Sequence, residues 1–335
     1  MNPLKHRAAQ AGVSRRILLG SAIGVSFATP ALAQAPWPSQ PIKMIIPFPA
    51  GGPTDFAARL IADKLTKSLG QNVIVDNRGG AAGMLGTTAL VQSKNDGYTI
   101  GLLGNGLVTL TPYVRKDVGF DPLKDLTPLS KAVDIPLLVV VNSALPVNNM
   151  KEFVAYAKAN PGKLSYGSDG QASLTHLTFE MLKQAYGLRI VHIPYRGTAQ
   201  LTNDLLANQI QVSMSGITGP LPFVRNGQLK AMAVTSAKRA AALPDVPTLI
   251  ELGQKDFDVT TWFSFFGPGG LPAPIAAKLN EHINMSLKEP DVIEKLRASG
   301  MEAAPTTQAG LGDIVNRYIA QWKGIIKSAG IKLED

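Results

Sequence analysis

Short β-rich runs alternate with helical patterns along almost the whole chain after residue 40. A strand pattern at 42–47 is followed by apolar residues at helical spacing over 54–69, and then by a second strand pattern at 72–76. Such alternation is typical of βαβ units, which build parallel sheets with helices packed on their faces. The sequence therefore predicts the α/β class.

The same alternation continues toward the C-terminus. Further strands are expected at 98–103, 137–141, 164–168, 190–195, 211–215, 229–235 and 260–266. Further helices are expected at 149–159, 174–186, 199–208, 274–287, 291–298 and 311–328. Two sheets with flanking helices account for these elements, and 335 residues suffice for two domains. The pattern leaves open whether the domains are sequential or one is inserted into the other.

The first 33 residues differ in character from the rest. They contain four basic residues, no acidic residue and an apolar run over 17–28. The letters SRRILL at 14–19 resemble a twin-arginine export signal, and an A-x-A cleavage pattern ends at Ala33. An uncleaved anchor helix is the alternative, but the run is shorter than the ~20 residues that span a bilayer. We therefore expect a signal peptide over 1–33, cleavage after Ala33 and a soluble mature protein in the periplasm.

Composition excludes several functions. The chain has no cysteine, which rules out disulfides, thiolate metal sites and cysteine nucleophiles. The formal net charge is +9, but without the first 33 residues only 29 basic residues face 24 acidic ones. These basic residues are scattered and do not alternate with aromatic residues, so we expect no nucleic-acid partner.

Polar loops follow four of the predicted strands, at 47–55, 101–106, 166–173 and 192–198. In open α/β sheets, ligands bind beyond the carboxyl ends of the strands. In the first loop, PFPAGGPTD, two glycines allow close approach of the backbone, and the helix that follows favours an anion at its N-terminus. We expect Thr54 or Asp55 to cap that helix. An ordinary strand-to-helix turn is the alternative for each loop alone, but four such loops together indicate a ligand site.

Catalytic and cofactor motifs are missing. The sequence contains no dinucleotide-binding glycine pattern after a strand, no P-loop, no G-x-S-x-G elbow and no H-E-x-x-H. His176 and His192 are interpreted as structural residues. We therefore expect a ligand site with no catalytic residues, no metal and no cofactor.

Several segments in order along the chain resemble the receptors of tripartite tricarboxylate transporters, the Bug family. They are PIKMIIPFPAGGPTDFAARLIADKL from Pro41, VDNRGGAAGMLGTTAL from Val75, DGYTI from Asp96, YGSDGQAS from Tyr166, VHIPYRGTAQ from Val191, LPDVPTLIELG from Leu243 and TWFSFFGPGGLPAPIAAKLN from Thr261. The resemblance covers essentially all of the chain after the signal peptide.

This resemblance implies a type II periplasmic-binding-protein fold, in which two α/β lobes are joined by a two-stranded hinge. It implies lobe 1 at 34–136 and 258–335, with lobe 2 at 137–257 inserted. Members bind small carboxylates, such as dicarboxylates, aromatic acids and acidic amino acids, and deliver them to membrane permease subunits. A monomer is expected.

The resemblance also implies where the ligand binds. The first lobe holds a carboxylate through backbone groups and water, and the second lobe faces it. The expected ligand-binding residues are Pro49, Ala50, Gly51, Gly52, Thr54, Asp55, Asn105, Ser168, Asp169, Ser173, Tyr195, Gly197, Thr198 and Ser215.

Three positions depart from the family pattern. Asp169 stands where the loop is usually uncharged, which disfavours a second carboxylate and would suit an amine. Ser215 stands where many relatives have an acidic residue, and Arg196 replaces a lysine. Arg196 could pair with a distal carboxylate or lie at the surface. These departures concern the identity of the ligand, not the fold.

Two other functions are alternatives to transport. A secreted hydrolase would use Ser168 and His176, and would lose turnover in Ser168→Ala. A sensor would bind the same ligand but signal to a membrane kinase instead of loading a permease.

Overall fold

The computed structural model describes residues 37–115, 118–195, 198–255 and 257–328. The predicted signal peptide at 1–33 lies outside these ranges, as do Arg196 and Gly197 of one predicted loop. Within the described ranges, no helix has an apolar stretch of the length that a bilayer requires.

The elements up to the middle of the chain are β1 (Ile42–Ile46), α1 (Pro53–Leu69), β2 (Val73–Asn77), the 3₁₀ turn Ala81–Gly83, α2 (Met84–Val91), β3 (Thr99–Gly104), the π-helical turn Gly106–Leu110, α3 (Thr111–Val114), β4 (Leu126–Asn142) and α4 (Met150–Ala159). The following elements are β5 (Ser165–Ser168), α5 (Leu174–Tyr186), β6 (Val191–Pro194), α6 (Thr198–Leu206), β7 (Val212–Gly216), α7 (Leu221–Arg225) and β8 (Leu229–Val234). The last are β9 (Thr260–Pro268), α8 (Ala273–Leu287), α9 (Pro290–Ala298), β10 (Glu302–Ala303) and α10 (Gln308–Ser328).

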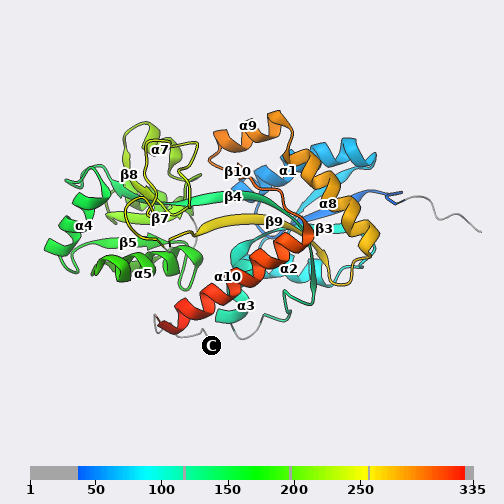
Figure 1. The fold of residues 1–335 in the computed structure, drawn as a ribbon, viewed down its shortest axis with the longest axis horizontal. Helices are drawn as coiled ribbons and strands as arrows, with labels where there is room; N and C mark the ends of the chain where they lie inside the picture. Colours follow the sequence, from blue (N-terminus) through cyan, green and yellow to red (C-terminus); the bar gives the residue numbers. More distant parts are fainter. Residues whose placement is uncertain (1–36, 116–117, 196–197, 256, 329–335) are drawn as a thin grey trace, which may run out of the picture. The chain divides into compact units, whose positions relative to one another are not determined.

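The strands form two groups that share β4. Across the sheet the order is β2-β1-β3-β9-β4-β7-β5-β6, with β8 and β10 also paired to β4. We use lobe 1 for β1, β2, β3, β9 and the first part of β4, and lobe 2 for β5 to β8 and the last part of β4. Figure 1 shows β4 and β9 side by side as the long strands of the molecule. The fold is thus α/β with two lobes, as the sequence predicts.

β4 is longer than the sequence predicts. The expected strand was 137–141, whereas β4 begins at Leu126. Its first part contains Pro128 and Pro136, and the pairing with β9 shifts register beside Pro128 and again between Lys131 and Val133. Prolines and charged residues weaken a strand signal in the sequence. Here bulges and pairing to β9 accommodate them.

Strand direction also differs from the expectation of purely parallel sheets. β1 runs parallel to both β2 and β3, and β5 runs parallel to both β6 and β7. In contrast, β9 is antiparallel to β3 and β4, and β4 is antiparallel to β7 and β8. The local apolar pattern of a strand does not encode its direction, so both lobes are mixed where they meet β4.

The carboxyl ends of the parallel strands in both lobes point toward the middle of β4. Gly104, the last residue of β3, lies opposite Phe263 of β9, and Phe263 lies opposite Val133 of β4. From the other side, Gly216, the last residue of β7, lies opposite Leu137 of β4. The loops that follow the parallel strands of lobe 1 and lobe 2 therefore converge on the same part of the molecule.

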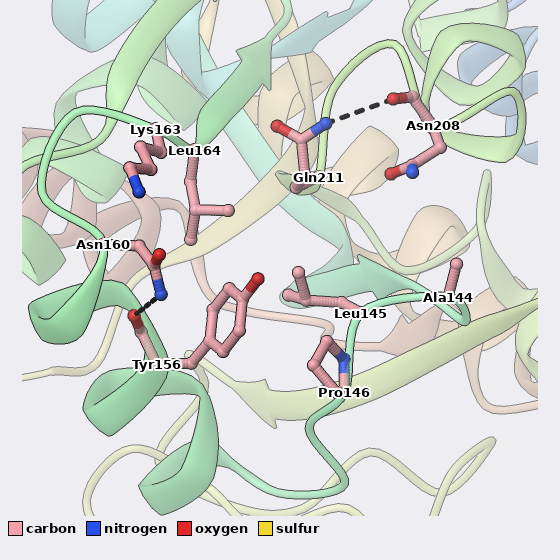
Figure 2. A pocket seen from close by; sticks show the side chains of 9 residues that line it. All are labelled: Ala144, Leu145, Pro146, Tyr156, Asn160, Lys163, Leu164, Asn208 and Gln211. Atoms are coloured by element: carbon pink, nitrogen blue, oxygen red, sulfur yellow. Dashed lines mark hydrogen bonds between the residues drawn. The ribbon is translucent and has the colours of Figure 1, made fainter.

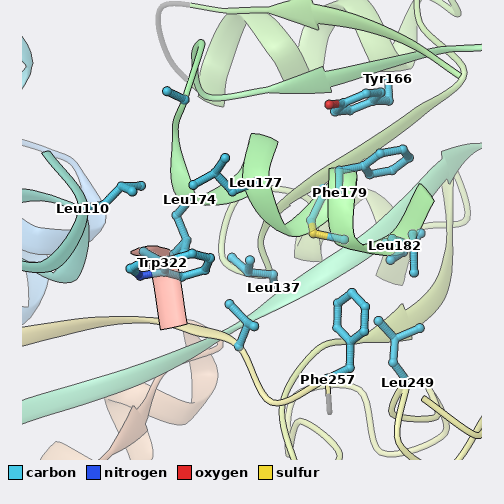
Figure 3. Close-up of a cluster of buried hydrophobic side chains, with 14 of the residues drawn as sticks. Leu110, Leu137, Tyr166, Leu174, Leu177, Phe179, Leu182, Leu249, Phe257 and Trp322 are labelled. Atoms are coloured by element: carbon cyan, nitrogen blue, oxygen red, sulfur yellow. The ribbon is translucent and has the colours of Figure 1, made fainter. Parts of the chain in front are cut away.

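A buried cluster connects α10 to both lobes. Trp322 of α10 is 0% exposed and belongs to one apolar cluster with Leu110 of lobe 1 and with Leu174 and Leu177 of α5 (Figure 3). Tyr318, one turn earlier, makes an edge contact with Trp262 of β9, with ring centroids 5.6 Å apart. The C-terminal helix thus stabilises the region where the two lobes meet.

Candidate functional site

The loop between β1 and α1 is shaped by Asp55. Gly51 has a φ of +85°, a left-handed conformation that favours glycine. Its N–H donates to Asp55 Oδ2 over 2.9 Å, and Arg59 Nε donates to the same oxygen over 3.0 Å. Asn77 Nδ2 donates to Asp55 Oδ1 over 3.0 Å. Hydrogen bonds from the protein itself therefore use both oxygens of the Asp55 carboxylate, and the bond to Gly51 holds the loop in its conformation.

These bonds determine the charge of Asp55. Burial would raise the pKa of its carboxyl group, but the hydrogen bonds from Arg59, Gly51 and Asn77 outweigh burial and hold the pKa below its ordinary value. The side chain is 5% exposed, although it lies close beneath the surface. Asp55 is thus an anion at neutral pH with its acceptor atoms already used.

The capping prediction for α1 is wrong. The N-cap is Gly52, and no side chain caps the helix, because Thr54 and Asp55 lie inside the first turn. Asp55 instead reaches back to Gly51, one residue before the cap. The N–H groups of the first turn have no partner within the helix, and the positive end of the helix dipole lies there. Pro49, Ala50 and Gly51 are exposed beside it. This arrangement favours an anion held by backbone groups.

Asn105 connects the end of β3 to the start of β9. Its side chain is 2% exposed, and its Nδ2 donates to the carbonyl oxygen of Thr260 over 3.0 Å. Thr260 Oγ1 in turn donates to Asp134 Oδ1 of β4 over 2.9 Å. Asn105 therefore stabilises the junction between β3, β9 and β4.

The loop between β5 and α5 is also tightly bonded. Ser168 is 0% exposed; its Oγ donates to the carbonyl oxygen of Gly170 over 3.0 Å and lies 2.6 Å from His192 Nε2. Ser173 caps α5, since its Oγ accepts from the N–H of His176 over 3.2 Å. The N–H of Ala172 donates to His176 Nδ1 over 3.0 Å. Ser168 is thus buried and paired with His192 rather than His176, which does not suit the hydrolase hypothesis.

Asp169 differs from its neighbours because its side chain is exposed. Thr198 Oγ1, at the start of α6, donates weakly to Asp169 Oδ1 over 3.4 Å, and the backbone N–H of Asp169 donates to Thr175 Oγ1 over 3.0 Å. Desolvation by the surrounding protein outweighs the hydrogen bonds and raises the pKa of Asp169 to about 6. The side chain reaches solvent at its surface, but protein surrounds the carboxyl group and removes most of its water, which disfavours the charged form.

Tyr195 and Ser215 are buried. Tyr195 is 7% exposed, and its hydroxyl donates to Asp204 Oδ2 of α6 over 2.8 Å. Burial and this carboxylate raise the pKa of Tyr195 to about 12. Ser215 is 1% exposed, and its Oγ has no hydrogen-bond partner among the described residues. The expected lobe 2 residues lie at the carboxyl ends of three neighbouring strands. The end of β5 and the loop after it contain Ser168, Asp169 and Ser173, the segment after β6 contains Tyr195 and Thr198, and the end of β7 contains Ser215.

The side chains that support these loops were not predicted from the sequence. Asn77 ends β2 and bonds both Asp55 and the carbonyl oxygen of Phe48. Asn77 directly follows the strand predicted at 72–76 and precedes Arg78-Gly79-Gly80. A polar residue and glycines after a strand are the same pattern that indicated the four polar loops, so this position could have been predicted. Arg59 lies in the second turn of α1 and Thr175 is the second residue of α5, and at both positions the sequence alone does not distinguish them from surface residues.

One surface pocket lies away from the candidate loops and another borders the loop between β1 and α1. One, of about 260 Å³, is lined by Tyr156, Asn160, Lys163 and Gln211 among others (Figure 2). It lies at the amino ends of β5 and β7, the edge of lobe 2 opposite the candidate loops. The other, of about 460 Å³, borders Gly51 and Asp55 from the side of α1 and α9. Among the described residues, no group of three or more His, Asp or Glu side chains could hold a metal ion.

Two α/β lobes with polar loops that converge from both carboxyl edges define a solute-binding protein. The chain belongs to the tripartite tricarboxylate transporter family of receptors, whose sequence model matches residues 57–331. This family consists of solute-binding receptors and not of enzymes. The family resemblance that the sequence predicts is thereby confirmed.

Three proteins illustrate this similarity. Protein BugT of Bordetella pertussis is 35% identical over 319 residues, covering 93% of this chain and 97% of BugT. The structure of R. palustris Rpa4515 with adipate has a TM-score of 0.80 at 31% identity, covering 88% of this chain and 99% of that protein. The structure of the periplasmic binding protein BugD has a TM-score of 0.77 at 36% identity, with 88% and 99% covered.

Proposed function

We propose that this protein captures a small carboxylate in the periplasm and delivers it to the membrane permease subunits of a tripartite tricarboxylate transporter. The ligand would be a dicarboxylate, an aromatic acid or an acidic amino acid. The observation that carries this proposal is the convergence of the candidate loops of both lobes on the middle of β4. The adipate in the structure of Rpa4515, a relative with the same fold, supports a carboxylate ligand.

The carboxylate would bind to the backbone of the loop between β1 and α1. Asp55 contributes by holding Gly51 in its left-handed conformation, since its own oxygens are occupied. Ala50, Gly52 and Thr54 would provide N–H groups, directly or through water, since Pro49 and Pro53 have none and that of Gly51 is bonded to Asp55. The loops after β5 and β6 would face the ligand from lobe 2, with Asp169 and Thr198 as the nearest side chains.

Three further parts of the proposal rest on the sequence. The export signal would be cleaved after Ala33. Lobe 1 would comprise 34–136 and 258–335, and lobe 2 would comprise 137–257. The protein would act as a monomer that closes around its ligand.

Thermal unfolding of the purified protein against a panel of carboxylates, amino acids and sugars tests the proposal. A ligand at 100 times its dissociation constant adds ~2.7 kcal/mol to the free energy of unfolding, enough for a clear rise in the midpoint. We expect the rise with carboxylates. A rise with sugars alone would contradict the proposed ligand class.

A matched pair of glycine variants locates the site. Gly51→Ala and Gly227→Ala both place a side chain at positive φ, +85° and +78°, and neither added Cβ meets an atom within 4 Å. Each should cost ~1–2 kcal/mol of stability through backbone strain. Only Gly51→Ala should reduce the ligand-induced rise, since Gly227 follows α7. Equal loss of binding in both variants would contradict this site.

A further inference from the structure

Asp169 lies in one of the loops that converge from both lobes on the middle of β4. It follows β5 directly, and its side chain is exposed whereas Ser168 before it is buried. Among the described residues, its carboxylate meets only neutral side-chain donors, the hydroxyl of Thr198 at 3.4 Å and, with a smaller effect, that of Thr175, and no cation lies within ion-pair distance. Asp55 in lobe 1 contrasts with it, because three donors occupy that carboxylate.

The two lobes therefore offer a ligand opposite chemistry. The loop between β1 and α1 offers backbone N–H groups at the positive end of a helix, which suit a carboxylate. The loop after β5 offers an anionic acceptor with unused lone pairs, which suits a cationic donor. A ligand with a carboxylate at both ends would place one of them against Asp169, and like charges at short range repel.

We propose that Asp169 makes this receptor selective for an amino carboxylate, with the carboxylate on the lobe 1 loop and the ammonium group on Asp169 and Thr198. This inference rests on the proposed function and narrows its ligand class. Thr198 contacts Oδ1 of Asp169, and the ammonium group would take acceptor sites that the hydroxyl groups leave on the carboxylate. The neutral hydroxyl orients Asp169 without neutralising it.

Isothermal titration of the purified protein with two matched sets of compounds tests the proposal. The sets are glutarate, glutamate and 4-aminobutanoate, and succinate, aspartate and 3-aminopropanoate. In each set, the amine is either absent, added to the dicarboxylate or placed where one carboxylate was. We expect at least one amine-bearing compound to bind about 10- to 100-fold more tightly than the dicarboxylate of its set, as for a hydrogen bond to a charged group.

Asp169→Asn keeps the shape of the side chain and removes its charge. This variant should abolish the preference for the amine-bearing compound and bring its dissociation constant within about threefold of that of the dicarboxylate. The control Asp245→Asn removes an exposed charge elsewhere in lobe 2 and should leave the preference intact. Binding of dicarboxylates in preference to amino carboxylates would overturn the inference but not the proposed function. An amine preference that survives in Asp169→Asn would overturn the role of Asp169. Failure of every carboxylate to bind would overturn the proposed function itself.

Discussion

His176 of α5 and His192 of β6 stack face to face, with ring centroids 3.9 Å apart and 5° between their planes. Tyr166 of β5 stacks on His192 at 4.8 Å, and Phe179 stacks on Tyr166 at 3.8 Å. His192 also contacts Ser168, the buried residue before Asp169. The stacked rings of α5, β5 and β6 thus pack next to Ser168 and stabilise the start of the loop after β5.

The stacked histidines should make stability depend on pH. Burial, with a smaller effect from His176, lowers the pKa of His192 to about 4, and burial also lowers the pKa of His176. Glu180 opposes both shifts and Lys183 adds to them. The folded state prefers neutral rings, so its stability is complete above the unfolded pKa of about 6.5 and is lost as the pH falls toward 4. We expect a loss on the order of 1–2 kcal/mol, measured by urea unfolding between pH 7 and 4.

Histidine-to-phenylalanine variants identify the source of that pH dependence. His192→Phe keeps a stacking ring but cannot be protonated, so the loss of stability between pH 6.5 and 4 should become smaller. His176→Phe should have a lesser effect in the same direction. An unchanged pH dependence in both variants would mean that other groups cause it.

Asp55→Asn should destabilise the protein by ~1–3 kcal/mol, because Arg59 and the N–H of Gly51 lose an ionised acceptor. The pKa of Asp55 is lowered in the folded state, so its contribution is present above the unfolded pKa of about 3.9 and disappears as the pH falls below it. Chemical denaturation at pH 7 and at pH 3 measures both effects. Asp63→Asn, on the exposed side of the same helix, should change stability by less than ~0.5 kcal/mol.

Asn105→Ala should cost ~1–3 kcal/mol, since the buried carbonyl oxygen of Thr260 loses its shorter side-chain hydrogen bond and keeps only the 3.5 Å contact from the Tyr318 hydroxyl. Asn203→Ala, an exposed position on α6, is the control and should change stability by less than ~0.5 kcal/mol. Thermal or urea unfolding compares them. If the two variants were equally stable, Asn105 would have no structural role at the junction of β3 and β9.

Trp322→Ala should be the most destabilising of these changes, at ~3–5 kcal/mol, because it opens a cavity in the cluster that connects α10 with both lobes. Trp322→Phe should cost less, since it leaves a smaller cavity. Asn316→Ala, on the exposed face of α10, should have little effect. A small loss in Trp322→Ala would indicate that the cluster does not depend on the indole.

Sequence periodicity predicted most helices closely, because an apolar stripe reports which face of a helix is buried. The helix expected at 274–287 begins one residue earlier, and the one at 174–186 is as expected. The first part of β4 was not predicted, because Pro128, Lys131 and Pro136 obscure its pattern. Its pairing with β9, more than a hundred residues away in the sequence, makes it a strand.

The sequence alone determined the α/β class, the family and the loops that end its strands, since these depend on local patterns and short motifs. It also placed Asp169 and Asp55 in two such loops, with Asp55 as a candidate helix cap and Asp169 as a departure from the family pattern. Only the tertiary structure showed how the two carboxylates are bonded: Asn77, Arg59 and the backbone of Gly51 occupy that of Asp55, whereas only neutral hydroxyl groups meet that of Asp169. Those partners come from different elements, so hydrogen bonding and desolvation are decided by how the chain packs.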